Sequence, residues 1–287
     1  MRLALGISPC PNDTFAFHGL LTRAVRVPGL ELDFELLDVQ ALNEAIAARR
    51  FHAAKSSSAA ALRQGADWIA LRAGSALGYG VGPVLLAAPG RAAQLDARGR
   101  IPEGARVLCP GDATTANLLY RLFRAGEGHI EQVVFSDILP ALQRGEADFG
   151  VCIHEGRFTW PSYGLSFVQD LGATWERHAN APLPLGVILG RRDLGLPVLR
   201  ALDAGLRASL DHARANPDEA FTTMRLYAQE LDDEALWKHV ELYVNAWTRD
   251  LGAEGADALR RLLGCARASG WVAEHAHPLQ VLDTEPR

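Results

Sequence analysis

The chain carries one order of predicted elements twice, and this recurrence restricts the fold more than any other feature of the sequence. An apolar run over residues 2–7 leads into a polar, proline-containing loop over 8–14 and then into a helical pattern. Residues 106–109, 110–115 and 116–123 follow the same order about 100 residues later. Strands that alternate with helices are typical of mainly parallel sheets. We therefore expect two similar α/β lobes.

Each predicted lobe continues with a second strand, a helix and a third strand. Residues 30–36 alternate apolar and charged side chains, as does a strand with one buried face. An apolar strand is also expected over 147–153. Ligands of parallel sheets bind beyond the carboxyl ends of the strands, so the residues that follow the third strands are of most interest. These residues are Lys55, Ser56 and Ser57 in the first half, and His154 and Glu155 in the second.

Two segments are expected to connect the lobes. The 287 residues suffice for about two domains. A glycine-rich stretch over 74–82 precedes an apolar run that leads out of the first lobe, and a strand over 186–190 leads back. The expected lobes are residues 1–87 with 187–287, and residues 88–186, with a central cleft between them.

Composition excludes several classes of protein. The 29 basic and 34 acidic side chains give a net charge of −5, whereas a broad nucleic-acid-binding face needs a basic excess. No apolar run is long enough to span a membrane, and the first residues lack the long apolar region of a signal peptide, which predicts a cytoplasmic protein. The four widely spaced cysteines match no zinc motif and are expected to be reduced thiols. These are Cys10, Cys109, Cys152 and Cys265.

His154 is the strongest candidate for a catalytic group. It directly follows an apolar strand, which places its ring at a carboxyl end. A histidine side chain can accept a proton near neutral pH without large tuning, so it suits a general base. The alternative is a histidine that is merely hydrogen-bonded at the strand end. Glu155 could orient the ring or be a solvated carboxylate.

The two loop-to-helix joints are candidate anion sites. Helix N-termini present unpaired N–H groups and partial positive charge. Ordinary helix capping by the same side chains is the alternative interpretation. The side chains at these joints are Asn12, Asp13 and Thr14 in the first half, and Thr114 and Thr115 in the second.

Three further features carry weaker signals. Lys55 and the hydroxyls of Ser56 and Ser57 could donate to a ligand or could mark a turn. Cys10 lies near a helix start, which would activate a thiol, but no base partner is evident. Asn245 on a predicted helix is either a packing residue or a contact in the cleft.

The motifs resemble those of the 1,4-dihydroxy-6-naphthoate synthases of the futalosine pathway of menaquinone biosynthesis. The resemblance rests on residues 8–15 (SPCPNDTF), 154–159 (HEGRFT), 182–186 (PLPLG) and 243–245 (YVN). It implies a periplasmic-binding-protein type II fold with two lobes. It also implies a cytoplasmic carbon–carbon lyase that converts cyclic dehypoxanthine futalosine to 1,4-dihydroxy-6-naphthoate without a metal or organic cofactor.

The resemblance also implies roles for individual residues. His154 corresponds to the family's proposed base, and the stretches Ser56-Ser57 and Thr114-Thr115 to its carboxylate contacts. With the residues considered above, the expected substrate-binding set is Asn12, Asp13, Thr14, Lys55, Ser56, Ser57, Thr114, Thr115, Glu155, Arg157, Leu185 and Asn245.

The expected partner is a small-molecule carboxylate, with no nucleic acid and no membrane; a homodimer is left open. Two other functions stay in view. One is a chorismate dehydratase of the same pathway, which acts on a different substrate. The other is a non-catalytic solute-binding protein, which would bind its ligand without turnover.

Overall fold

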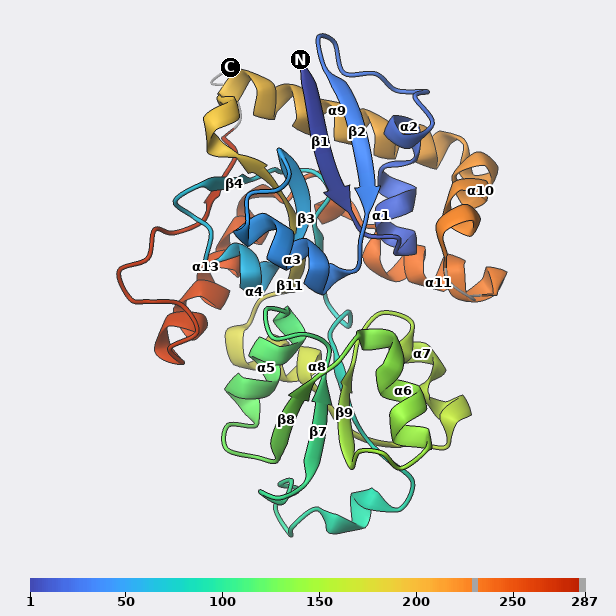
Figure 1. The fold of residues 1–287 in the computed structure, drawn as a ribbon, viewed down its shortest axis with the longest axis vertical. Helices are drawn as coiled ribbons and strands as arrows, with labels where there is room; N and C mark the ends of the chain where they lie inside the picture. Colours follow the sequence, from blue (N-terminus) through green and yellow to red (C-terminus); the bar gives the residue numbers. More distant parts are fainter. Residues whose placement is uncertain (229–231, 284–287) are drawn as a thin grey trace. The chain divides into compact units, whose positions relative to one another are not determined.

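The computed structural model describes residues 1–228 and 232–283. The chain forms two compact units. Unit 1 comprises Met1–Gly78 and Pro184–Arg287, and unit 2 comprises Tyr79–Leu183 (Figure 1). Unit 2 is thus inserted into the sequence of unit 1, and each unit has a sheet of its own.

Unit 1 is built on a seven-stranded mixed sheet with the order β12-β4-β11-β3-β1-β2, and β5 pairs with β11. β1 runs parallel to both β2 and β3, whereas β11 is antiparallel to β3 and β4. The strands are β1 (Arg2–Ile7), β2 (Glu31–Leu36), β3 (Ala53–Ser57), β4 (Trp68–Ala70), β5 (Ala76–Gly78), β11 (Leu183–Arg191) and β12 (Gln280–Val281).

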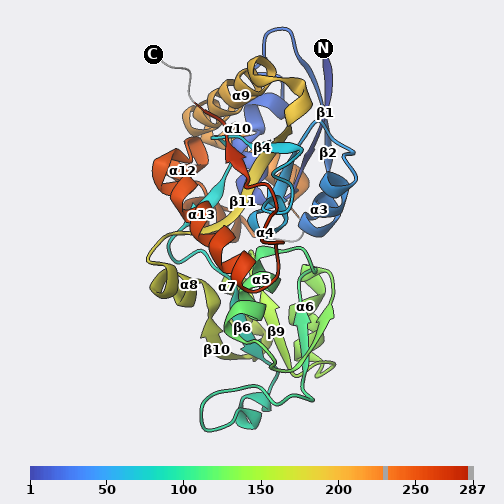
Figure 2. The same ribbon diagram turned by 90° about the vertical axis from the view of Figure 1, so that its left-hand side faces the viewer.

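Helix α9 (Leu196–Ala215) covers one region of this sheet with a continuous apolar stripe. Leu199, Leu202, Leu206 and Leu210 recur every three or four residues and are all buried in one cluster with the β1 side chains. Helix α13 lies beside α4 (Figure 2). The remaining helices of unit 1 are α1 (Pro11–Ala16), α2 (His18–Leu21), α3 (Val39–Ala47), α4 (Ser58–Ala61), η3 (Arg192–Leu194), α10 (Pro217–Tyr227), α11 (Asp233–Tyr243), α12 (Ala246–Arg249) and α13 (Gly252–Ala268).

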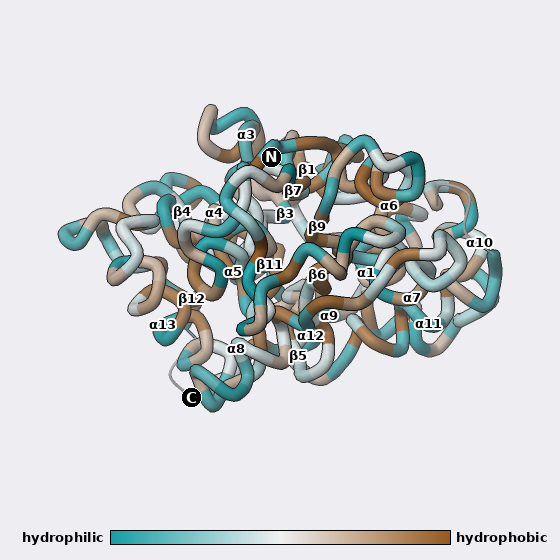
Figure 3. Tube along the Cα trace, turned by 90° about the horizontal axis from the view of Figure 1, so that it is seen from below, coloured by the Kyte–Doolittle hydropathy of each residue, from teal (hydrophilic) through white to brown (hydrophobic). Residues whose placement is uncertain are grey.

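Unit 2 contains a five-stranded mixed sheet with the order β10-β6-β9-β7-β8. β7 is parallel to β8 and β9, and β6 is antiparallel to β9 and β10. β9 carries no charged side chain, and β11 carries none before Arg191, its last residue (Figure 3). The elements are β6 (Val84–Ala87), η1 (Arg91–Gln94), β7 (Arg106–Cys109), α5 (Thr115–Phe123), β8 (His129–Gln132), α6 (Phe135–Gln143), β9 (Phe149–Cys152), α7 (Gly156–Thr159), η2 (Trp160–Tyr163), β10 (Ser166–Asp170) and α8 (Leu171–Ala179).

The predicted α/β class is confirmed, but the sheets are less parallel than expected. β6, at the start of unit 2, is antiparallel to both of its neighbours, β9 and β10, and β11, by which the chain returns to unit 1, is antiparallel to β3 and β4. The structure also places β6 in unit 2, where it pairs with β9 and β10, whereas the sequence analysis put residues 83–87 in the first lobe. The central cleft stays a prediction. Across residues 1–228 and 232–283, none of the helices combines the length and apolar character needed to cross a membrane.

Candidate active site

The first helix of unit 1 begins earlier than predicted. Pro11 occupies its first turn, where the fixed φ of proline suits a helix and its missing N–H is not needed. Cys10 precedes it, and its carbonyl oxygen accepts from the N–H groups of Asp13 and Thr14, each at 3.0 Å. Asn12, Asp13 and Thr14 therefore lie within α1, and the prediction that one of them caps it is wrong. The Thr14 hydroxyl also donates to the Cys10 carbonyl, at 3.1 Å.

A buried ion pair joins α1 to β3. Lys55 Nζ lies 2.5 Å from Asp13 Oδ1, and both side chains are almost fully enclosed. The Ser8 hydroxyl donates to Asp13 Oδ2 at 2.7 Å, and Lys55 Nζ also donates to the Gly74 carbonyl at 3.1 Å. Such pairing is what allows a charged group to be buried. Lys55 and Asp13 thus neutralise each other instead of presenting separate charges.

Ser56 and Ser57 lie on β3, so the interpretation of these residues as a turn is wrong. Asn43 of α3, which the sequence analysis missed, organises them. Its Oδ1 accepts from the Ser57 N–H at 2.9 Å and its Nδ2 donates to the Ser57 hydroxyl at 3.0 Å. The Ser56 hydroxyl donates to the Ser57 carbonyl at 3.0 Å. A polar residue beside the buried Leu42 and Ile46 of α3 was the only signal.

A second missed residue, His239 of α11, contacts Asn12. The His239 ring is 1% exposed, and its Nε2 lies 2.9 Å from Asn12 Oδ1. The same ring packs on Tyr243, with 4.5 Å between ring centroids. α11 therefore supports the start of α1 through a polar contact that joins residues 227 positions apart.

Asn245 does not lie within a helix but caps α12. Its Oδ1 accepts from the Trp247 N–H at 2.9 Å, while the Thr248 hydroxyl accepts from the Asn245 N–H at 3.0 Å, which forms a capping box. Its Nδ2 donates to the Leu77 carbonyl at 2.8 Å, which ties α12 to β5. Both polar atoms of this side chain thus hold backbone within unit 1.

In unit 2, Thr114 caps α5, as the capping interpretation predicts. Its hydroxyl accepts from the Asn117 N–H at 3.2 Å and donates to the Gly111 carbonyl at 2.8 Å. Thr115 is the first residue of the nine-residue helix and is buried. The side-chain oxygen of Asn117 is buried and has no hydrogen-bond partner among the residues that the structure describes.

His154 lies in the turn after β9, separated from the end of the strand by Ile153. Its backbone is left-handed, with φ of 55°, a conformation that costs most residues about 1–2 kcal/mol. The half-buried ring stacks on Phe135, the first residue of α6, with centroids 4.9 Å apart and planes 27° apart. Strained backbone of this kind clusters at functional sites. Glu155 comes next, as the N-cap residue of α7.

Arg157 anchors this segment within unit 2. Its guanidinium lies 2.7 Å from Asp170 Oδ2 and donates to the Gly82 carbonyl at 2.8 Å. These contacts hold α7 against the chain that precedes β6 and the end of β10. Leu185, another expected binding residue, lies on β11 in unit 1 and is partly exposed.

The cysteines of unit 2 do not offer a nucleophile. Burial raises the pKa of the Cys109 thiol to about 12, and burial likewise raises the pKa of Cys152 above its ordinary value. A thiol must lose its proton to attack, so both are inert near neutral pH. Cys10 is buried at the start of α1.

Within each unit, two of the candidate residues follow or end parallel strands at the same edge of the sheet. β1 and β3 are parallel neighbours, so Asp13, after β1, meets Lys55 near the end of β3. β7 and β9 are also parallel neighbours, so Thr114 and His154 follow strands that end at the same edge. The carboxyl edge of a parallel pair is where α/β proteins bind ligands and carry out chemistry.

Comparison with known proteins agrees with this architecture. A periplasmic aliphatic sulphonate binding protein of Escherichia coli aligns with a TM-score of 0.66 at 12% identity, covering 100% of this chain and 95% of the other, and so shows a periplasmic-binding-protein fold. A structure from Archaeoglobus fulgidus aligns with a TM-score of 0.85 at 30% identity, covering 94% and 98%.

Two curated relatives and a family assignment identify the lineage. A 1,4-dihydroxy-6-naphtoate synthase of Thermus thermophilus is 46% identical over 97% of this chain and 99% of its own. The protein of the same name from Streptomyces coelicolor is 40% identical over 94% of each. The family described as menaquinone biosynthesis matches residues 3–268. The chain belongs to this menaquinone biosynthesis family, and it is an enzyme of menaquinone biosynthesis.

Proposed function

We propose that the protein is a carbon–carbon lyase that converts cyclic dehypoxanthine futalosine to 1,4-dihydroxy-6-naphthoate. The observation that carries this proposal is its similarity, over nearly the full length, to two proteins named as synthases of that product. In the proposed reaction, removal of a proton leads to cleavage of a carbon–carbon bond, release of a sugar fragment and aromatisation of the ring. We expect the protein to act in the cytoplasm.

His154 is the proposed general base. Its position just past β9 and its half-buried ring suit a group that must reach a substrate yet stay oriented. Phe135 stacks on one face of the ring and limits its rotation, and the left-handed backbone fixes where the side chain leaves the chain. A positioned base contributes about 10²–10⁴-fold to a rate.

The start of α5 is the proposed carboxylate contact in unit 2. The Thr114 hydroxyl already caps the helix, so the remaining N–H groups of the first turn and Thr115 are the donors we assign to the ligand. In unit 1, we assign the corresponding role to the Ser56-Ser57 stretch, which Asn43 holds in place. Donors fixed in this way can stabilise negative charge without rearranging.

The direct test is product formation by the purified chain. We expect incubation with cyclic dehypoxanthine futalosine to yield 1,4-dihydroxy-6-naphthoate, detected by mass spectrometry. A parallel incubation with chorismate should leave chorismate unchanged. Formation of a dehydrated enol ether from chorismate would instead assign the chain to the dehydratase, and recovery of unchanged ligand in both would favour a solute-binding protein.

His154→Asn tests the base. Asparagine tolerates left-handed backbone, so this variant keeps the chain path and removes the imidazole. We expect turnover to fall by about 10²–10⁴-fold with little change in melting temperature. His129→Ala, which removes an exposed histidine of β8, is the matched control and should retain full activity. Wild-type turnover by His154→Asn would remove His154 from this role.

A further inference from the structure

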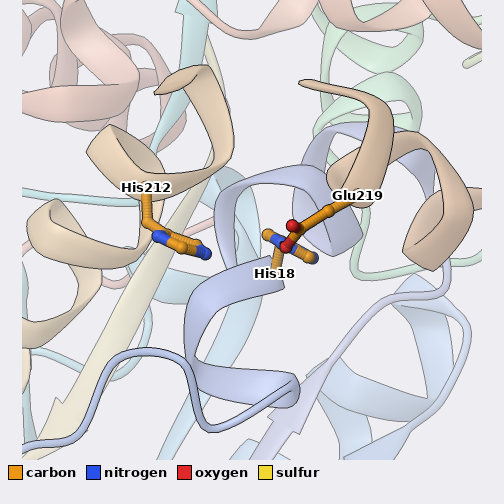
Figure 4. A group of neighbouring side chains, drawn as sticks. All are labelled: His18, His212 and Glu219. Atoms are coloured by element: carbon orange, nitrogen blue, oxygen red, sulfur yellow. The ribbon is translucent and has the colours of Figure 1, made fainter. Parts of the chain in front are cut away.

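We infer that His18, His212 and Glu219 form a binding site for a divalent transition metal ion, which we assign as Zn²⁺. The three residues lie on three different helices of unit 1: α2, α9 and α10. In Figure 4 the ring of His212 points toward His18, and Glu219 reaches over His18 from the other side. The resemblance to the synthases implies no metal, so this site goes beyond the proposed function.

The donor atoms are close enough to share one ion. One ligand atom from each residue lies within 4.8 Å of the other two, and His18 Nε2 is 4.0 Å from Glu219 Oε2. Two imidazoles and a carboxylate, with a water in the fourth position, form a common tetrahedral zinc set. Zinc ligands lie about 2.0–2.2 Å from the ion, so the side chains must close in by about 1 Å. Glu219, whose side chain is 69% exposed, can move toward the ion, and the half-buried His212 ring, which stacks on His18 with planes 10° apart, must also turn so that both nitrogens face it.

Two buried ring nitrogens at this site make no hydrogen bond to the described residues. Neither His18 Nε2 nor His212 Nε2 has a hydrogen-bond partner among the residues that the structure describes. His18 is 2% exposed, so water does not compensate for the missing bond at its ring. An unsatisfied buried polar atom is unfavourable, and two side by side call for a shared ligand. A metal ion between them satisfies both.

The second nitrogen of His18 is already oriented. His18 Nδ1 lies 2.8 Å from the Thr223 hydroxyl, and such a bond fixes the ring so that Nε2 can face a metal. His212 Nδ1 lies 3.3 Å from the Asn216 Nδ2 donor. Metal binding at Nε2 would leave the ring proton on Nδ1, so this long contact would be lost. Asn216 Nδ2 would keep its 2.9 Å hydrogen bond to the His212 carbonyl.

The expected role is to fasten helices. α10 also packs against α1, which carries Asn12 and Asp13. An ion that joins α2, α9 and α10, which all belong to unit 1, would therefore stabilise the support of that helix. No sequence motif announces the site, because His18 is separated from the other two ligands by about two hundred residues.

The test measures metal binding by the full-length chain. Protein treated with a chelator is titrated with ZnCl₂ by calorimetry, and its melting temperature is recorded with and without the metal. We expect one ion per chain and a higher melting temperature. Glu219→Gln and His212→Asn should each weaken the affinity roughly tenfold or more, while His129→Ala, an exposed histidine of unit 2, should leave affinity and stoichiometry unchanged.

Two outcomes would overturn the inference. One is a wild-type chain that neither binds Zn²⁺ at a one-to-one ratio nor gains stability. The other is binding that both variants retain at wild-type affinity, which would mark an adventitious ion elsewhere. Glu219→Gln keeps the test decisive if His212→Asn fails to fold, because the Glu219 side chain is exposed. The test measures metal binding and melting temperature, not turnover. A negative result therefore does not affect the lyase proposal, and absence of lyase activity does not affect the proposed zinc site.

Discussion

The two carboxyl edges, β1 with β3 in unit 1 and β7 with β9 in unit 2, share a sequence pattern but not a chemistry. At the edge in unit 1, Lys55 and Asp13 bond to each other and to Ser8 and Gly74. At the edge in unit 2, His154 stands on strained backbone and stacks on one ring. A recurring strand–loop–helix order thus sets where polar residues occur, whereas their local partners decide how each of them is held.

The largest effect that would test this comparison is loss of the buried ion pair. Lys55→Met leaves Asp13 charged and enclosed, so we expect the free energy of unfolding to fall by about 3–5 kcal/mol. Arg157→Met breaks the Arg157–Asp170 pair of unit 2, whose side chains are 18% and 20% exposed, and should cost less because water can reach Asp170. Urea denaturation measures both. Equal losses in the free energy of unfolding would mean that the two ion pairs contribute equally to stability, and the contrast between the two edges would fail.

The next largest effect is the loss of stability at alkaline pH, which we expect from the buried Cys109 thiol of unit 2. Burial raises the pKa of Cys109 to about 12, so the folded chain holds this proton while the unfolded thiol loses it near pH 9. The stabilisation is therefore complete below pH 9 and is lost as pH rises toward 12. At pH 10 we expect a loss of about 1.4 kcal/mol from this thiol, seen by urea denaturation at pH 8, 9 and 10. Cys109→Ala should flatten the decline; an unchanged slope would contradict the assignment.

Thr114→Val tests whether the cap and the proposed ligand contact can be separated. The Thr114 hydroxyl donates to Gly111 and accepts from Asn117, so its loss removes the helix cap, and we expect the free energy of unfolding to fall by about 1 kcal/mol. The change in KM, expressed as a free energy, should be smaller than the change in the free energy of unfolding. Thr114→Ser keeps the hydroxyl and should behave as wild type in both measurements. A raised KM at unchanged stability would show that the hydroxyl serves the ligand and not the helix.

The smallest expected effect concerns Phe135 as a positioning residue for His154. Stacked rings contribute about 0.5–1.5 kcal/mol beyond their buried area, so Phe135→Leu should lower kcat roughly 2- to 10-fold with KM little changed. Phe123→Leu removes a comparable pair, in which Phe123 meets His178 edge to face at 5.7 Å, and should leave kcat unchanged. Equal kcat losses in both variants would mean a general effect on packing.

The sequence predicted the parts of the fold that depend on local pattern. Apolar runs located β1 and β7, and the polar residues after an apolar strand located His154. The helix start at Pro11 was missed because a proline that ends a strand can equally begin a helix. The sheets were expected to be more parallel because periodicity reveals a strand without its direction.

The partners of the site residues could not be predicted, because they lie far apart in the sequence. Lys55 meets Asp13 across 42 positions and His239 meets Asn12 across 227. Local patterning carries no information on such pairs. Asn43 and His239 each resembled an ordinary polar residue on a helix, and only the fold shows that both are buried and hydrogen-bonded.

The position of β11 in the sheet of unit 1 sets the order in which the chain can fold during synthesis. β11 lies between β3 and β4, yet it is translated after all of unit 2. When the ribosome has produced Tyr79–Leu183, unit 2 has every strand of its own sheet, whereas β3 and β4 still lack the strand that joins them. Domains generally fold as units as they emerge, so the inserted unit matures first and the unit that holds both chain ends closes last.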